Sequence, residues 1–203
     1  MDGLEKRYFK AREIRAEAKE GSAGTISGYA IVFDELSEEL GFYTTFREKI
    51  RRGAFADSMN GDVYAFWSHD SSVVLGRTTN KTLRLKEDAH GVGFELDLPD
   101  TTAGRDAFAL IKRGDVSGMS FGFMVETEEW DYGTDDNEDR IRTIVKGKLF
   151  EVSPTAFPAY PQTEVDTRSL DEVAKRGKEK LPSISKTIRE FGTEERRLKL
   201  SML

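Results

Sequence analysis

The stretch Arg113-Gly114-Asp115-Val116-Ser117-Gly118-Met119-Ser120-Phe121-Gly122-Phe123-Met124-Val125 decides how this chain is expected to fold. From Met119 onward, large apolar side chains occupy alternate positions, which is the period of a β-strand with one buried face. Gly118 and Gly122 flank Ser120, and a glycine inside a strand often marks a close approach by another backbone or a ligand. The pattern fits a serine nucleophile on an open strand. It also fits an exposed serine on an edge strand with glycines at bulges.

Short β-like segments surround this strand on both sides, and the helical signals are few. We expect strands over Tyr8–Ile14, 24–33, Asp62–Asp70, Val73–Arg77, Leu83–Glu87, Gly91–Leu98 and Ile141–Val152. A short helix is expected within 52–59, and a longer one over Asp106–Lys112 that ends at Gly114. Pro154 and the prolines after it should end regular structure. About eight short strands with one or two helices indicate a mainly β fold, an antiparallel β-barrel or sandwich.

Length and composition exclude several classes of protein. A chain of 203 residues suggests one domain with extensions or two small domains. No run of about 18 apolar residues is present, so we predict no membrane span. Residues 1–7 lack an apolar signal core, which predicts a cytoplasmic protein. Because the chain has no cysteine and two histidines, we predict no disulfide, no metal site and no cofactor.

Charge divides the chain into two parts. The net charge is -6, but residues 168–203 hold ten Lys/Arg against six Asp/Glu, so the first 167 residues carry -10. An acidic body argues against specific nucleic-acid binding, which needs a basic face. The segment after residue 166 has too few apolar residues to form its own core, which predicts a charged, flexible tail.

Serine chemistry needs a base that takes the proton of the hydroxyl. Imidazole, with a pKa of about 6.5, is the usual base near neutral pH. His90 lies in an Asp-Ala-His-Gly turn that is typical of a solvated loop histidine. His69 ends a predicted strand, and it could be the base for Ser120 or a structural histidine bonded to Asp70. Spacing alone leaves both interpretations of His69 open.

Several blocks follow one another in order between about Tyr8 and Val165. They are Gly53-Ala54-Phe55, Trp67-Ser68-His69-Asp70, Leu75-Gly76-Arg77, Gly104-Arg105-Asp106, 113–123, Glu151-Val152-Ser153-Pro154 and Pro158-Ala159-Tyr160-Pro161. Together they resemble the prohead protease family of tailed bacteriophages, capsid maturation serine proteases that are similar in fold to herpesvirus assemblin. The resemblance implies an antiparallel β-barrel of the assemblin type with peripheral helices over residues 1–166. A charged tail over 167–203 would follow it.

The resemblance also implies functional residues. The family's histidine falls on His69 and its serine on Ser120. In assemblin the third catalytic residue is a second histidine after the serine, whereas no histidine follows Ser120 here. We predict Glu151 instead, because it follows the serine, ends a strand and needs a partner in an otherwise apolar stretch. Asp70, Glu95 and Asp97 are the alternatives for this role. For oxyanion donors, the chain offers backbone N–H groups near Ser120 and the arginines Arg77 and Arg105, which fit ordinary salt bridges equally well.

The implied function is that of a serine endopeptidase acting inside the assembling procapsid, in the cytoplasm of the bacterial host. It would cleave the scaffolding segment of the major capsid protein and then itself, including its tail. Its partners would be the capsid protein, the scaffold and further copies of itself, with no membrane and no specific nucleic acid. Two other classes are open: a non-catalytic procapsid scaffold or assembly protein that retained the fold, and a β-barrel binding module.

Overall fold

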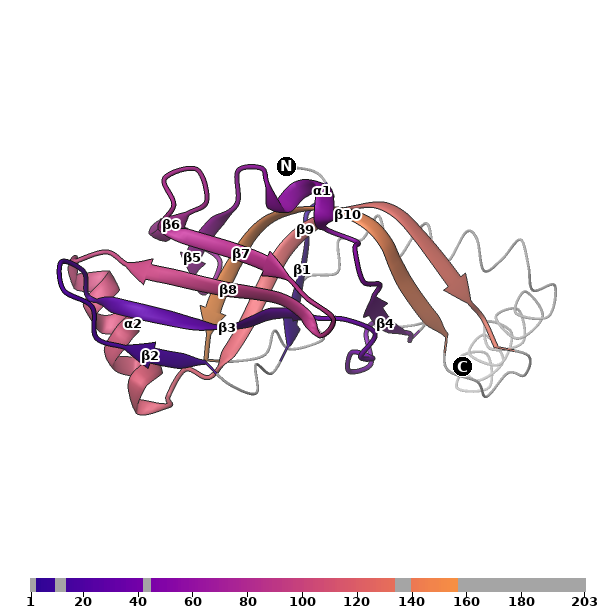
Figure 1. The fold of residues 1–203 in the computed structure, drawn as a ribbon. Helices are drawn as coiled ribbons and strands as arrows, with labels where there is room; N and C mark the ends of the chain where they lie inside the picture. Colours follow the sequence, from indigo (N-terminus) through magenta and orange to yellow (C-terminus); the bar gives the residue numbers. More distant parts are fainter. Residues whose placement is uncertain (1–2, 10–13, 42–44, 134–139, 157–203) are drawn as a thin grey trace, which may run out of the picture. The chain divides into compact units, whose positions relative to one another are not determined.

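The computed structural model describes residues 3–9, 14–41, 45–133 and 140–156 of the chain. Twelve elements follow one another in these ranges (Figure 1). They are β1 (Glu5–Phe9), β2 (Arg15–Glu17), β3 (Gly24–Val32), β4 (Arg47–Ile50), α1 (Ala56–Met59), β5 (Tyr64–Trp67), β6 (Asp70–Arg77), β7 (Leu83–Glu87), β8 (Gly91–Leu98), α2 (Thr102–Arg113), β9 (Gly118–Asp131) and β10 (Ile141–Thr155). The predicted tail, residues 167–203, lies outside the described residues.

The strands form two sheets, and the mainly β fold is confirmed. One sheet has the order β1-β9-β10-β5-β6, with β4 also paired to β10, and the other has the order β2-β3-β8-β7. No closed barrel is found among the described strands, so the predicted barrel is unconfirmed. The six-stranded sheet is also not purely antiparallel, because β10 pairs in parallel with both β4 and β5. Parallel pairs need a crossover connection, and the local sequence patterns used above cannot show one.

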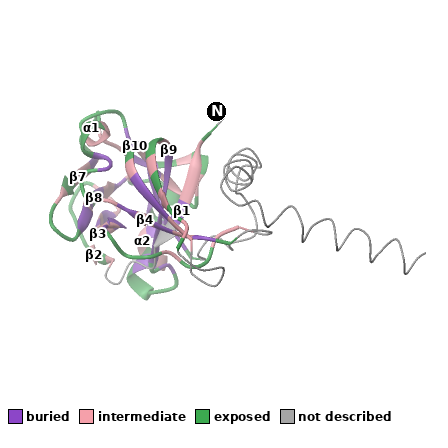
Figure 2. Ribbon diagram, turned by 90° about the vertical axis from the view of Figure 1, so that its right-hand side faces the viewer, coloured by how far each residue is buried: buried purple, intermediate pink, exposed green. Residues whose placement is uncertain are grey.

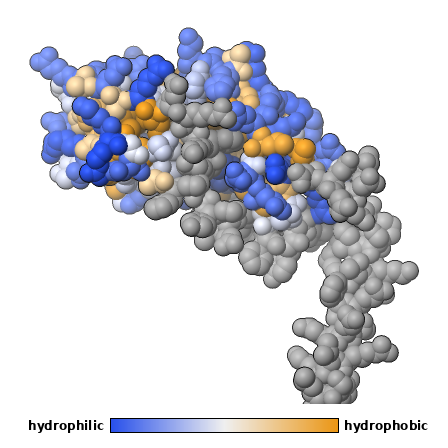
Figure 3. All heavy atoms as spheres, turned by 90° about the horizontal axis from the view of Figure 1, so that it is seen from below, coloured by the Kyte–Doolittle hydropathy of each residue, from blue (hydrophilic) through white to orange (hydrophobic). Residues whose placement is uncertain are grey.

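Side chains from both sheets share one hydrophobic core. The buried strands stand out in purple in Figure 2. Phe55 lies in edge-to-face contact with Phe121 and Phe123, which come from β9. Leu96 of β8 and Ile26 of β3 contribute from the second sheet and are fully buried. On the face seen in Figure 3, hydrophilic residues cover most of the described surface, with orange patches between them. No helix of the described residues is long and apolar enough to cross a membrane.

Local signals predicted several elements well. β7 and β8 have the expected bounds, and Gly114 ends α2 in the left-handed conformation with φ 86°. The helix begins four residues earlier than expected, because the side chain of Thr101 accepts a hydrogen bond from the Gly104 backbone N–H at 3.2 Å.

Two expectations about the strands near the serine are wrong. The face of β9 that carries Ser120 is not open, since residues 118–123 are all buried. Both edges of this strand are also paired, one with β1 and the other with β10. Pro154 does not end regular structure, because β10 continues to Thr155 and Pro154 pairs with Met119.

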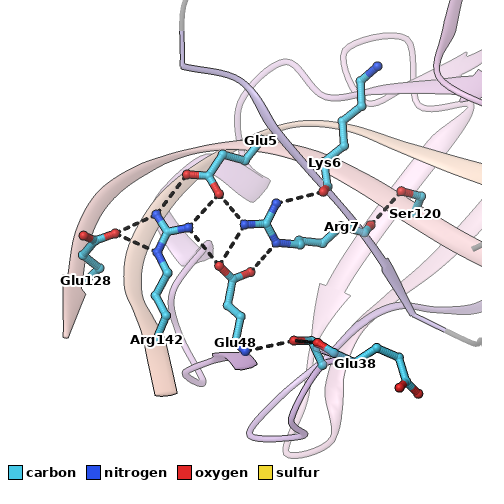
Figure 4. A network of polar contacts seen from close by, with 9 residues as sticks. Glu5, Lys6, Arg7, Glu38, Glu48, Ser120, Glu128 and Arg142 are labelled. Atoms are coloured by element: carbon cyan, nitrogen blue, oxygen red, sulfur yellow. Dashed lines mark hydrogen bonds and ion pairs between the residues drawn. The ribbon is translucent and has the colours of Figure 1, made fainter. Parts of the chain in front are cut away.

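A buried ion-pair network joins β1, β4, β9 and β10 (Figure 4). Arg142 contacts Glu5 at 2.8 Å, Glu48 at 3.0 Å and Glu128 at 2.6 Å, while Arg7 contacts Glu48 at 2.7 Å. Burial raises the pKa of Glu5, but hydrogen bonds and charge from Arg142 and Arg7 outweigh it and hold this pKa below its usual value. Each charge in the network therefore depends on its partners, because an isolated buried charge is costly.

We expect Arg142→Met to lower the free energy of unfolding by about 3 to 5 kcal/mol, because it removes one of the two arginines that pair with the buried carboxylates. Urea denaturation followed by circular dichroism would measure the change. Arg51→Met is the matched control, since its ion pair with Glu129 is exposed and should contribute little. Equal midpoints for the two variants would contradict the expectation.

Candidate active site

His69 lies in the two-residue turn between β5 and β6. Both Ser68 and His69 have positive φ angles, 50° and 65°, a conformation that costs non-glycine residues about 1 to 3 kcal/mol each. The end of β10 holds this turn in place. The Ser68 N–H donates to the Pro154 carbonyl at 3.1 Å, and the His69 N–H donates to Ser153 Oγ at 3.3 Å. These backbone bonds thus hold the turn in place independently of any contact that the imidazole makes.

The imidazole of His69 joins a serine to a carboxylate. Its Nε2 lies 2.6 Å from Ser120 Oγ, and its Nδ1 lies 2.6 Å from Glu151 Oε1. The side chain of His69 is 16% exposed, whereas Glu151 and Ser120 are buried. The structure therefore brings together the three residues that the sequence singled out, in the order hydroxyl, imidazole, carboxylate.

Strand pairing explains why these side chains meet. Ser120 on β9 lies directly opposite Ser153 on β10, and Glu151 lies opposite Gly122. On its other edge β10 pairs with β5, where Glu151 is the partner of Tyr64. The turn that carries His69 follows β5 directly and so lies beside the same part of β10.

Gly122 provides the space for the carboxylate. A Cβ at this position would lie 2.5 Å from Glu151 Oε1, closer than real Cβ contacts allow, and 3.0 Å from Glu151 Cγ, which is a tight contact. The sequence predicted that a ligand or a backbone approaches the glycines beside Ser120. For Gly122, the group that approaches is instead the side chain of Glu151.

The other candidate carboxylates have different partners. Asp70 accepts hydrogen bonds from the backbone and side chain of Ser72, which lower its pKa. Asp97 and Glu95 both pair with Arg84, and the hydrogen bond from Arg84 holds the pKa of Asp97 far below its usual value. Of the four carboxylates considered from the sequence, Glu151 is the one in contact with His69.

The remaining candidates lie in ordinary surroundings. His90 is exposed and makes an edge-to-face contact with Tyr29, with ring centroids 4.7 Å apart. On sequence alone, Arg77 and Arg105 fit either oxyanion donors or ordinary salt-bridge residues. In the structure both form exposed ion pairs with nearby aspartates. Within the described ranges, no group of three or more His, Cys, Asp or Glu side chains is placed to hold a metal ion.

Ser153 belongs to the site, although the sequence assigned it no role. It is fully buried, its Oγ donates to Glu151 Oε2 at 2.5 Å, and the same oxygen accepts from the His69 N–H. One hydroxyl thus orients both the carboxylate and the turn that carries the imidazole. The available signal was its spacing, because residues two apart on a strand share a face.

A hydroxyl, an imidazole and a buried carboxylate in this order form the arrangement that activates a serine in serine hydrolases. The serine peptidases are a class within that group. The sequence model of the caudovirus prohead serine protease family matches residues 10–176, and the chain belongs to this family. Neither the curated proteins nor the solved structures gave a match.

We expect Gly122→Ala to lower peptidase activity about a hundredfold or more, because the new methyl group displaces the Glu151 carboxylate from His69. The stability cost should be about 1 to 3 kcal/mol, as for other small overpacking changes. Hydrolysis of a capsid-protein substrate and urea denaturation would measure the two effects.

Gly93→Ala is the matched control, because a Cβ there would lie 3.5 Å from its nearest neighbour. If Gly122→Ala acts through Glu151, the double variant Gly122→Ala/Glu151→Gln should be no slower than Glu151→Gln alone. Full activity in Gly122→Ala would show that the contact between Glu151 and His69 is not needed.

Proposed function

We propose that this chain is the endopeptidase that removes the scaffolding segment of the major capsid protein inside the assembling procapsid, in the cytoplasm of the bacterial host. The observation that carries the proposal is the hydrogen-bonded order of Ser120, His69 and Glu151 in a chain of the prohead serine protease family. The three residues come from β9, the β5–β6 turn and β10, so the arrangement depends on how these strands pair within the six-stranded sheet.

Each residue has one role in the proposed mechanism. Ser120 Oγ attacks the carbonyl carbon of the scissile bond, and His69 Nε2 takes the hydroxyl proton. His69 then gives this proton to the leaving amine, and a water molecule hydrolyses the acyl-enzyme by the same route. Glu151 accepts the Nδ1–H bond, which keeps the Nε2 lone pair directed at the serine and stabilises the imidazolium that forms. Ser153 holds the carboxylate in that position.

The substrate partners follow from the same proposal. They are the major capsid protein with its scaffold and further copies of this chain, since the enzyme would also cut itself. The predicted cationic segment over 167–203 is the proposed site of self-cleavage, because a polar segment without a core of its own is easily cut. Its net charge of +4 against -10 for the rest would draw it toward the acidic part of the chain at low salt.

Co-expression with the capsid protein, followed by intact-mass spectrometry, tests both activities at once. The wild-type chain should cut the capsid protein and lose mass from its own C-terminus, with the cut between about residues 165 and 197. Ser120→Ala and His69→Ala should do neither, because they remove the nucleophile and the base. The double variant should be no worse than either single variant, since the two residues act as one unit.

Each alternative has its own outcome in this experiment. Equal trimming of the wild type and Ser120→Ala would mean that a host protease removes the tail. Near-normal processing of the capsid protein by Ser120→Ala would overturn the assignment of the nucleophile. An intact capsid protein beside folded wild-type enzyme would favour the non-catalytic scaffold.

The third residue has a separate test. We expect Glu151→Gln to lower turnover by about 10² to 10⁴-fold while leaving measurable activity, because the nucleophile and base remain. Asp70→Asn should stay within about twofold of the wild type, because Asp70 contacts Ser72 and not His69. Single-turnover cleavage of a capsid-derived peptide would give both rates. The reverse order of damage would make Glu151 a structural residue.

A further inference from the structure

The hydroxyl of Ser120 is covered by a strand of the same chain. β1 runs antiparallel along β9, with Tyr8 as the partner of Ser120 and Arg7 as the partner of Phe121. The Ser120 Oγ lies 2.7 Å from the carbonyl oxygen of Arg7 (Figure 4), and Ser120 is 1% exposed. A peptide could therefore not reach the serine while β1 is in place.

The hydroxyl proton has two competing acceptors. They are the Arg7 carbonyl oxygen at 2.7 Å and His69 Nε2 at 2.6 Å, and a hydroxyl carries one proton. While the proton points at the Arg7 carbonyl, it is not directed at His69 Nε2. The docked β1 strand therefore holds the serine in an inactive hydrogen bond.

The side chain of Arg7 occupies a buried acidic site, which we call the arginine site and define by Glu48, Arg142 and Phe123. Arg7 Nε donates to Glu48 Oε1 at 2.7 Å, and Arg7 Nη2 donates to Glu48 Oε2 at 3.0 Å. The guanidinium also lies 5.7 Å from the ring centroid of Phe123. Two parallel bonds to one carboxylate match the planar fork of arginine better than the point charge of lysine.

The loss of Arg7 shows what this site would bind once β1 has left. Departure of β1 removes Arg7 and Glu5 together, so the net charge of the network does not change. Glu48, which is 2% exposed, would lose both bonds from Arg7 and keep its contact with Arg142 at 3.0 Å. A buried carboxylate that has lost two of its hydrogen bonds favours binding of a new guanidinium.

We propose that the edge of β9 beside Ser120 is the peptide-binding edge of the enzyme, and that β1 lies on it as a resident, substrate-like strand. The peptide would add to β9 as an extended strand after β1 leaves. Its arginine would fill the arginine site. In β1, the carbonyl in contact with Ser120 Oγ is that of Arg7. The arginine of a peptide bound in the same way would therefore directly precede the bond that is cut. The inference rests on the proposed function, and it adds a substrate class and an inhibited state.

A fluorophosphonate labels Ser120 when the serine oxygen bonds to its phosphorus and fluoride leaves, so the labelling rate measures how accessible the nucleophile is. In the full-length chain, Arg7→Gln should be labelled at least about tenfold faster than the wild type, because it loses both bonds to Glu48 and β1 is held less tightly. Arg51→Gln is the matched control, since it removes an exposed arginine far along the sequence from β1. Its labelling rate should equal that of the wild type.

Circular dichroism would verify that the variants are folded. Equal labelling rates for the wild type and folded Arg7→Gln would overturn the inhibited state. If Arg7→Gln does not fold, hydrogen exchange of the wild-type chain replaces it. The backbone amides of residues 5–9 should then exchange at least about tenfold faster than those of β8, and exchange as slow as that of β8 would overturn the proposal.

The substrate class is tested on the wild-type enzyme with three peptides that differ at one position. They carry Arg, Lys or Gln directly before the same bond of a capsid-protein cleavage site. The arginine peptide should have a kcat/KM at least about thirtyfold above the glutamine peptide, with lysine between them. Equal values for the three peptides would overturn the arginine site.

A wrong function and a wrong role for β1 would give different results. If the proposed function is wrong, Ser120→Ala still processes the capsid protein. If only this inference is wrong, processing requires Ser120, but the labelling rates or the three peptides show no difference.

Discussion

The pairing of β10 on both of its edges is the constraint on which the site depends. One edge is hydrogen-bonded to β9 and the other to β5 and β4. This register places Glu151 against Gly122 and Ser153 against Ser120, and it places the end of β10 where it can hold the turn that carries His69. Successive strand residues point to opposite faces, so a slip of one residue would turn Glu151 away from the imidazole.

A second element, β1, contacts both the buried ion-pair network and the proposed nucleophile. Its Arg7 side chain enters the ion-pair network with Glu48, while its Arg7 carbonyl lies on the Ser120 hydroxyl. Arg7 thus connects the ion-pair network with Ser120. Because a half-paired buried network is costly, β1 is held firmly only while its arginine is in place. In the proposed inhibited state, this coupling would keep Ser120 inactive for as long as β1 is in place.

Much of the secondary structure followed from local sequence. Alternation over Leu83–Glu87 and Gly91–Leu98 predicted two strands with their observed bounds, and Gly114 marked the end of the helix before β9. The sequence also singled out Ser120 and His69, and the resemblance to prohead proteases agreed with these residues. It missed Ser153, because a small hydroxyl two residues from a carboxylate has no distinctive signal until its partners are known.

The sequence by itself determined the class of fold, the family and the residue types available for chemistry, because periodicity and short motifs are properties of neighbouring residues. Only the tertiary structure decided which groups meet. Glu151 and Ser120 lie 82 and 51 positions from His69, and Arg7 lies 113 positions from Ser120. Such contacts depend on strand order and register, which no local pattern encodes. For the same reason, the alternation around Ser120 suggested an open strand, whereas residues 118–123 are all buried and both edges of β9 are paired.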